Sequence, residues 1–342
     1  MTTKVQSPPF TLEYVKTIGM INNVGRGRGF LVPYSIARSA DGRFFVLDRN
    51  LVRISVCNFD EDYLGEFATW YGEGDGDQKF QSPAGMAFDS QERLYVVDEG
   101  KDQVFVYTTD GEYIREWGAH GSGDAELDGA CGIAFDSADN AYVVDQYNHR
   151  VQVFSTEGEY RSQWGEFGDG KGQFNMPWGV AVDSRDHVYV ADWRNDRIQK
   201  FTQDGRFLSS FGESGSRDGQ LDRPSAVAVD SQGFMYVADW GNQRVQVLDP
   251  DGGFVQKLRG QSTLTKWTKE FFESNIDERD TRAIANLYPA LPEHLQDPNN
   301  ESSQTEPYFW GLTSLILDDQ ERLYVIENRR HRFQIFQRAP AP

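Results

Sequence analysis

The amino-acid sequence predicts an all-β protein in which a unit of four short strands is repeated six times. Apolar runs of strand length end on an acidic residue at Asp48, Asp98, Asp145, Asp192, Asp239 and Glu327. These residues lie 50, 47, 47, 47 and 88 positions apart, so the last step holds one repeat and an insertion. The 33 glycines and the 13% of aromatic residues are typical of strands joined by turns. Residues 1–342 are therefore expected to form a single six-bladed β-propeller.

The fourth repeat shows most clearly how each blade is built. PWGVAVD, VYVAD and DRIQKF are three runs of strand length, and GRFLSSFG supplies the fourth. Turn sequences such as DSRD and QDG separate them. Asp-Gly pairs at 110–111, 204–205 and 251–252 are hairpin signals between the third and fourth strands. Each repeat is therefore predicted to form four antiparallel strands.

Three short motifs recur in the same order in the repeats. They read CGIAFD, AYVVD and NHRVQVF in the third copy, and PSAVAVD, MYVAD and NQRVQVL in the fifth. These motifs resemble the NHL repeat, and the resemblance covers essentially the whole chain except for about residues 260–306. It implies a six-bladed NHL-type β-propeller. The first and sixth copies differ most, because Ser39 replaces the first-strand Asp and Glu327 replaces the second-strand Asp.

The N-terminal residues are predicted to close the ring of blades. The sixth copy ends after its third strand, RFQIF at 332–336, so its fourth strand is missing. The sequence TLEYVKTIG at 11–19 resembles the fourth strands of the other copies. The N-terminal strand should therefore pair into the last blade and cover an edge that would otherwise invite aggregation.

The recurring Asp and Arg residues are interpreted as structural and not as catalytic. An Asp closes the second strand and an Arg opens the third strand in several copies, as in the pairs Asp145/Arg150, Asp192/Arg197 and Asp239/Arg244. A residue that recurs in every blade usually stabilises a structural feature that all blades share. Here the two charges can pair across the connecting loop and cap its backbone groups.

Residues 260–306 interrupt the pattern between the fifth and sixth copies and predict a short helical insertion. Two amphipathic helices are expected, over 264–272 and 277–287. Their apolar stripes are Leu264, Trp267, Phe271 and Phe272, then Ala283, Ile284 and Leu287. Because this connector opens on the same face as the channel mouth, the insertion is expected to form a lid over that mouth. A dimer contact is the alternative.

Residues that differ between copies at equivalent positions are the candidates for ligand binding. The start of each inner strand and the loop between strands two and three should open on one face, around the central channel. The candidates at these positions are Tyr34, Arg49, Cys131, Tyr147, Trp178, Trp193, Ser225, Trp240 and Thr313. An aromatic rim around a few polar groups suits a small or flat ligand. The alternative is that the tryptophans pack blade against blade.

An enzyme acting on a small molecule at the mouth, a lyase or a hydrolase, is the alternative to a binding protein. The chain distantly resembles peptidyl-α-hydroxyglycine amidating lyase, which binds zinc through His residues directly after the Pro of the repeat. Those positions here hold Tyr34, Ala84, Cys131, Trp178, Ser225 and Thr313, so the zinc ligands of that family are absent. The resemblance would assign its catalytic Arg to Arg49 and its catalytic Tyr to the region of Tyr147. Since the five histidines form no cluster, no metal and no other cofactor is predicted.

Charge and hydropathy exclude other classes. The net charge of −19 opposes the phosphate contacts that nucleic-acid binding requires, and RNA binding is therefore not expected. An acidic field favours cationic or neutral partners. No apolar run reaches the roughly 18–20 residues that span a bilayer, and the N-terminus has no signal-peptide pattern. We expect a soluble cytoplasmic protein that binds a small molecule or a protein at its mouth. Its oligomeric state is left open.

Overall fold

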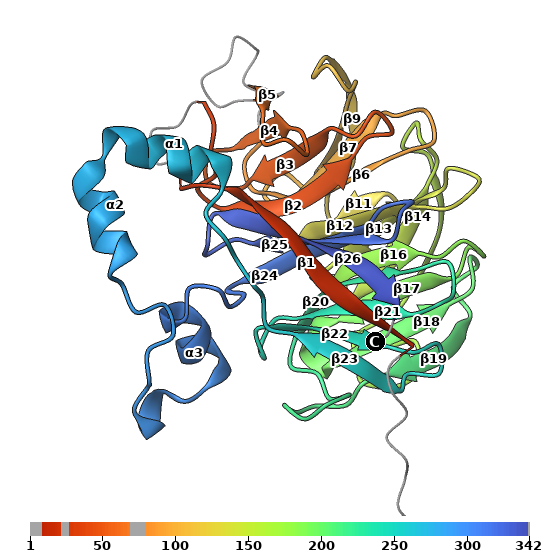
Figure 1. The fold of residues 1–342 in the computed structure, drawn as a ribbon. Helices are drawn as coiled ribbons and strands as arrows, with labels where there is room; N and C mark the ends of the chain where they lie inside the picture. The colour runs from red at the N-terminus through yellow and green to blue at the C-terminus, as the bar shows by residue number, and fades with distance from the viewer. Residues whose placement is uncertain (1–8, 22–26, 69–79, 341–342) are drawn as a thin grey trace, which may run out of the picture.

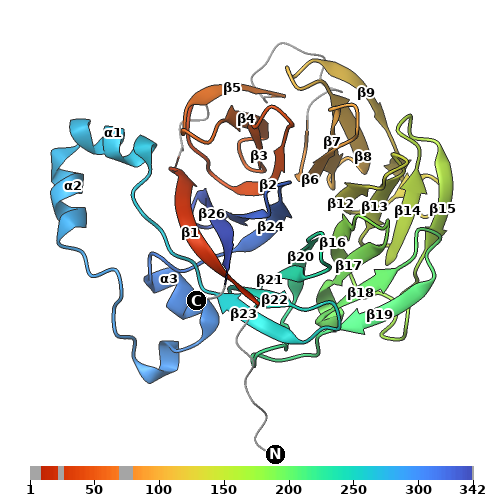
Figure 2. The same ribbon diagram turned by 45° about the vertical axis from the view of Figure 1, so that its right-hand side comes forward.

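Six four-stranded antiparallel sheets surround a central channel in the computed structural model, which describes residues 9–21, 27–68 and 80–340 (Figures 1 and 2). Each sheet is one blade, and the first strand of each blade faces the channel. The innermost strands of neighbouring blades contact one another all the way round the ring. The predicted all-β, six-bladed propeller is thus confirmed.

The strands follow the predicted order, from the channel outward in blades one to five. Blade one holds β2 (Pro33–Arg38), β3 (Phe44–Asp48), β4 (Arg53–Cys57) and β5 (Tyr63–Phe67). Blade two holds β6 (Pro83–Phe88), β7 (Leu94–Asp98), β8 (Gln103–Tyr107) and β9 (Tyr113–Trp117). Blade three holds β12 (Ala130–Phe135), β13 (Ala141–Asp145), β14 (Arg150–Phe154) and β15 (Tyr160–Trp164). Two paired strands of two residues each, β10 (Ala119–His120) and β11 (Glu126–Leu127), lie in the connector between blades two and three.

The remaining blades repeat this arrangement. Blade four holds β16 (Pro177–Val182), β17 (Val188–Asp192), β18 (Arg197–Phe201) and β19 (Phe207–Phe211), with a 3-10 turn at Trp193–Asn195. Blade five holds β20 (Pro224–Val229), β21 (Met235–Asp239), β22 (Arg244–Leu248) and β23 (Phe254–Leu258). Blade six holds β24 (Leu312–Leu317), β25 (Arg322–Glu327), β26 (Arg332–Pro340) and β1 (Phe10–Gly19).

The ring is closed by the N-terminal strand, as the sequence predicts. β1 is the outermost strand of blade six and pairs antiparallel with β26, from Phe10 opposite Pro340 to Gly19 opposite Arg332. A bulge between Tyr14 and Lys16 shifts the register once. The edge of β26 that would otherwise be exposed is therefore paired.

The hydrophobic core lies between the blades as six separate clusters. Between blades two and three, for example, Val97 and Val104 pack with Val143 and Phe154. Leu127, from the connector between these blades, is fully buried in the same cluster. Alternation of apolar side chains along the inner strands thus gives each blade two buried faces.

The repeated polar residues have the structural role that was inferred for them. In blade four, Asp192 accepts hydrogen bonds from the backbone N–H of Asn175 at 2.8 Å and from Nε of Arg197 at 2.8 Å. Arg197 also donates to the carbonyls of Gly170 and Gln173. The same contacts recur around Asp145 and Asp239. This cluster anchors the connector between successive blades and carries no chemistry of its own.

The insertion contains α1 (Lys266–Ser274), α2 (Ile276–Ala283), a 3-10 turn (Glu293–Leu295) and α3 (Pro298–Gln304), and it lies outside the ring. Both views show these helices beyond β1, on the outer side of blade six (Figures 1 and 2). Within the described residues, each helix is too short or too polar to cross a lipid bilayer.

Residues 261–267, which we call the strap, explain this position. They cross β1 and are held by Tyr14, whose hydroxyl accepts from the Thr263 N–H at 3.0 Å, and by Gly19, whose carbonyl accepts from Thr265 Oγ1 at 3.0 Å. Trp267 is 1% exposed and fills the seam between blades six and one, where Phe30 contacts its ring and the Glu61 carbonyl accepts from its Nε1. Trp267, the buried residue of α1, thus fills this seam.

The expected lid over the channel mouth is not formed. None of the residues 260–306 lines the cavity at the mouth, and Trp267 of the first predicted helix is buried at the seam instead. The second predicted helix, 277–287, is observed as α2 and ends at Ala283. Its Ile284 is 87% exposed and covers nothing. The alternative of a dimer contact stays a prediction.

Candidate functional site at the channel mouth

A cavity of about 220 Å3 lies where the sequence places the channel mouth, and we call it the mouth cavity. Its side chains come from the starts of the inner strands and from the loops between second and third strands in blades one to four. The lining residues are Tyr34, Arg49, Glu99, Cys131, Gln146, Met176, Trp178 and Trp193. Functional side chains are therefore brought together from segments that are far apart in the sequence.

Two aromatic rings meet across the channel at this point. Tyr34 begins the inner strand of blade one, and Trp178 begins that of blade four, which stands opposite in a ring of six. The rings are stacked, with centroids 6.1 Å apart and an interplanar angle of 29°. A smaller cavity of about 90 Å3 continues inside the channel and is lined by inner-strand residues of all six blades. Tyr34 and Trp178 thus stand between the channel and the mouth.

A run of tryptophans extends from this pair along blades four and five. The Trp178 and Trp193 ring centroids are 5.7 Å apart, and those of Trp193 and Trp240 are 6.3 Å apart, both in edge-to-face contact. Edge-to-face pairs are a favoured geometry for aromatic side chains. The run forms an aromatic wall, by which we mean Tyr34, Trp178, Trp193 and Trp240.

Guanidinium groups lie over three rings of this wall. The Cζ atom of Arg49 is 4.7 Å from the ring centroid of Tyr34. Arg194 Cζ is 5.5 Å from the Trp193 ring, and Arg223 Cζ is 4.9 Å from the Trp240 ring. These distances are in the range of cation–π contacts.

One carboxylate links the polar groups on the other side of the mouth. Nη2 of Arg49 donates to Oε2 of Glu99 at 2.5 Å and to Oγ of Ser82 at 2.8 Å. The Tyr147 hydroxyl donates to Oε1 of Glu99 at 3.1 Å. Both oxygens of Glu99 are thus used, and the carboxylate holds Arg49 and Tyr147 in place.

The two tyrosines and the cysteine of the mouth are held in their neutral forms. Burial raises the pKa of Tyr34, and burial followed by the charge of Glu99 raises the pKa of Tyr147. Burial also raises the pKa of the Cys131 thiol well above its ordinary value. None of the three is therefore ionised at neutral pH, and Tyr147 is poorly suited to remove a proton from a substrate.

The structure distributes the nine candidate residues over three places. Tyr34, Arg49, Cys131, Trp178 and Trp193 line the mouth cavity. Tyr147, 44% exposed, and Trp240 border it through their contacts with Glu99 and Trp193. Ser225 and Thr313 lie deeper and line the channel cavity. Ser225 Oγ donates to the Leu312 carbonyl at 2.8 Å, whereas the buried hydroxyl of Thr313 has no hydrogen-bond partner among the described residues.

Three lining residues were not among the candidates: Glu99, Gln146 and Met176. Glu99 and Gln146 directly follow the acid of the second strand, which is also the position of Arg49. This equivalence is the signal that would have identified them. Met176 precedes the inner strand of blade four and has φ of 51°, so a left-handed turn directs it to the mouth.

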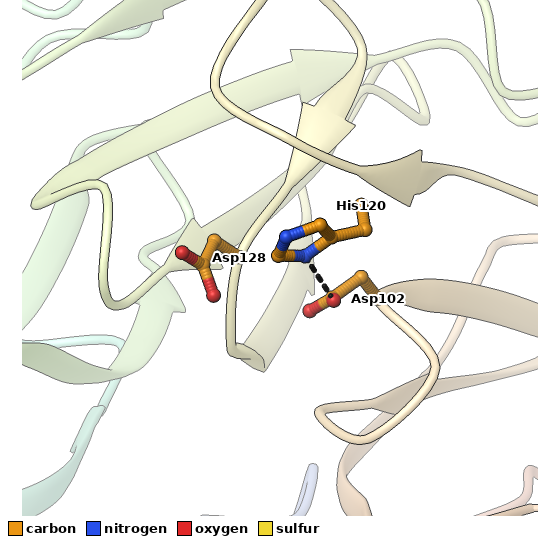
Figure 3. A group of neighbouring side chains, drawn as sticks. All are labelled: Asp102, His120 and Asp128. Atoms are coloured by element: carbon orange, nitrogen blue, oxygen red, sulfur yellow. Dashed lines mark hydrogen bonds and ion pairs between the residues drawn. The ribbon is translucent and has the colours of Figure 1, made fainter.

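Asp102, His120 and Asp128 form a separate cluster, with ligand atoms all within 4.8 Å of one another (Figure 3). Oδ2 of Asp102 lies 2.8 Å from Nδ1 of His120, and Oδ1 accepts from the Gly129 N–H at 2.7 Å. Blade four repeats this arrangement, because Asp196 bonds Ser214 Oγ at 2.6 Å and the Arg223 N–H at 2.7 Å. We therefore interpret Asp102 as a structural anchor of its loop.

Comparisons with known proteins agree with this fold. The family model of the NHL repeat matches residues 127–154, 174–201 and 221–248. A protein of unknown function from Bacteroides thetaiotaomicron has a TM-score of 0.64 at 15% identity, over 96% of this chain and 75% of its own. An auxiliary nutrient binding protein from the same species has a TM-score of 0.61 at 9% identity, over 96% and 77%.

A catalytically inactive virginiamycin B lyase from Staphylococcus aureus, solved with quinupristin, has a TM-score of 0.57 at 12% identity, over 97% of this chain and 89% of its own. No curated protein matches the sequence. At identities this low, the similarity extends to the fold alone. The neighbours include one protein named as a lyase and one named as a binding protein, so the fold is compatible with both roles.

Proposed function

The chain is a six-bladed β-propeller of the NHL-repeat type, and we propose that it binds a small, flat molecule in the mouth cavity. The observation that carries this proposal is the contact of Tyr34 with Trp178 across the channel. It places aromatic surface over the axis of the ring, where a ligand can stack on it, and blocks the channel below. Concave, aromatic-lined sites with a few fixed polar groups are typical of small-molecule binding.

A binding role is favoured over an enzymatic one by the state of Arg49 and Tyr147. Both side chains bind Glu99, and the raised pKa of Tyr147 opposes its use as a base at neutral pH. The virginiamycin B lyase supports an enzyme only through its fold. The auxiliary nutrient binding protein supports binding on the same limited ground.

A small molecule is favoured over a protein partner at this site. The cavity of about 220 Å3 is below the roughly 300–1,000 Å3 of drug-sized ligand sites, and its aromatic wall is recessed. The ligand is therefore a compact molecule of one or two rings.

Tryptophan fluorescence and calorimetry with a panel of compact aromatic compounds test this proposal. The Trp193→Ala variant should lose binding, because Trp193 lines the cavity. Trp310→Ala is the matched control, since Trp310 bonds Asn299 at the outer edge and is absent from the cavity lining. Equal losses in both variants, or no binding to the wild type, would contradict the proposal. Recovery of the bound compound in altered form would favour the enzyme.

A further inference from the structure

We infer that the mouth cavity takes a flat ring that carries a carboxylate, although the chain as a whole is strongly acidic. This inference rests on the proposed binding at the mouth and concerns the charge of the ligand. The net charge of −19 favours cationic partners by itself. The guanidinium groups at the aromatic wall instead favour a ligand with a negative charge.

Three of the four rings of the aromatic wall already have a guanidinium over one face. Arg49, Arg194 and Arg223 lie over the rings of Tyr34, Trp193 and Trp240, respectively. A ligand cation would have to displace these groups from the negative ring faces or approach them against like charge. Aromatic cages that bind ammonium ligands instead keep their ring faces open. A cationic ligand is therefore disfavoured.

The positive charge at the wall is only partly balanced. Arg49 is paired with Glu99, with 2.5 Å between Nη2 and Oε2, and Arg223 with Asp222, with 2.8 Å between Nε and Oδ1. Among the described residues, no carboxylate lies within ion-pair distance of Arg194. The wall thus carries one guanidinium without a counter-charge. A carboxylate is the group that its planar fork binds best.

The nearby carboxylates do not supply this counter-charge. Glu99 is engaged by Arg49 and Tyr147. Asp128 belongs to the cluster with Asp102 and His120, on the connectors of blades two and three and not on blade four (Figure 3). Arg194 is exposed and stands just outside the cavity lining, with its Cζ 5.5 Å from the ring of Trp193, which lines the cavity. A substituent on a ligand ring beside Trp193 would therefore point toward this guanidinium. The ring of the ligand would then contact Trp193, and its carboxylate would contact Arg194.

Three probes of one shape test the inference: 2-naphthoate, 2-naphthamide and 2-naphthylmethylammonium, titrated calorimetrically into the full chain at low ionic strength. Naphthoate should bind about tenfold more tightly than the amide, as expected for one charge-assisted hydrogen bond. The Arg194→Gln variant should remove this advantage and leave amide binding unchanged. Arg206→Gln is the matched control, because Arg206 is also exposed and lies in blade four, in the hairpin at the opposite face.

The outcomes separate the inference from the proposed function. If the amide or the ammonium binds as tightly as naphthoate, and Trp193→Ala abolishes this binding, the mouth is a binding site but the inferred ligand charge is wrong. If Arg194→Gln and Arg206→Gln weaken naphthoate equally, the charge effect is general and the inference also fails. If none of the probes binds, both the inference and the proposed function are contradicted.

Discussion

Tyr34 stacks on Trp178 across the central channel, with ring centroids 6.1 Å apart, although the two residues belong to opposite blades. The inner strands of the described blades contact their neighbours around the circumference. This pair therefore joins two halves of the propeller at its mouth, and it covers the channel cavity in which Ser225 and Thr313 lie.

The Trp178→Ala variant should open the channel to reagents from the mouth. Cys131 lines both cavities, and its Sγ lies 3.3 Å from the Trp178 carbonyl. Its thiol should react faster with a maleimide in this variant, because the ring above it is gone. The variant should also lose stability. Because Trp178 is only half-buried, we expect its free energy of unfolding to fall by about 2 kcal/mol. Truncation of a fully buried aromatic side chain costs more, roughly 3–5 kcal/mol.

Peptide mapping provides the control for this experiment. Cys57, the other cysteine, is buried in the seam between blades six and one and should remain unreactive in both proteins. If the reactivity of Cys131 were the same with and without Trp178, the aromatic pair would not be the barrier at the mouth.

The Trp267→Ala variant should destabilise the seam between blades six and one. The side chain is 1% exposed, so its removal should cost about 3–5 kcal/mol. Hydrogen–deuterium exchange should rise first in β1, which the strap crosses, and in β26, which pairs with β1, and least in blade three. Ile284→Ala changes an 87% exposed residue of the same insertion and should leave stability and exchange unaltered. Uniform faster exchange would argue against a local role of the strap.

The Arg244→Gln variant should leave a buried charge without its partner. Nε of Arg244 lies 2.7 Å from Oδ2 of Asp239, and its Nη atoms bond the carbonyls of Ser216, Arg217 and Gln220. Breaking a buried pair costs about 3–5 kcal/mol. Chemical denaturation would measure this loss, and the exposed Arg206→Gln variant should show none.

The pH dependence of that loss has a defined sign. Burial raises the pKa of Asp239 above its ordinary value even with Arg244 present. Without the guanidinium the pKa should rise further, so the carboxyl becomes protonated more readily and the deficit shrinks as the pH falls. A deficit that grew in acid would contradict the assignment of Arg244 as the partner of Asp239.

The pair of His120 and Asp102 should contribute to stability in acid and not in base. The hydrogen bond between His120 and Asp102, followed by the charge of the Asp102 carboxylate, raises the pKa of His120 (Figure 3). The folded state thus holds the proton more tightly than the unfolded state. The contribution is complete below about pH 6.5, the ordinary value, and is lost as the pH rises through the folded pKa.

Thermal unfolding as a function of pH measures this effect. The His120→Gln variant should lose the corresponding part of the pH dependence, and its melting temperature should match the wild type at high pH. A wild-type stability that increased between neutral and basic pH because of His120 would have the wrong sign.

The fold could be predicted because each blade repeats the same solution. The acids from Asp48 to Asp239 recur at steps of 47 to 50 residues, and the sequence at 11–19 resembles the fourth strand that the sixth repeat lacks. The candidate site was reached only in part by the same route. Comparing equivalent positions located Tyr34, Arg49 and Trp178, but the sharing of Glu99 by Arg49 and Tyr147 depends on side-chain directions that a repeat does not encode.

The position of the insertion shows a second limit. An amphipathic stripe indicates that a helix packs on an apolar surface, but it does not indicate which surface. Two were available to α1: the channel mouth and the seam beside β1. Trp267 fits the seam, where its ring is buried against Phe30 and the Glu61 carbonyl accepts its Nε1–H. The lid prediction failed because the stripe does not specify which of the two surfaces Trp267 fills.

The pairing of β1 with β26 also decides how the ring would yield to force. Phe10 and Pro340 lie opposite each other at the same end of the two strands, so tension between them would load the hydrogen bonds one after another, as in a zipper. Such geometry resists weakly at each step. Opening would proceed from Phe10 to Tyr14 and then meet the strap, where Tyr14 is bonded to Thr263 and Gly19 to Thr265. The strap would therefore act as a mechanical stop that keeps the ring closed after its outermost strand has begun to peel.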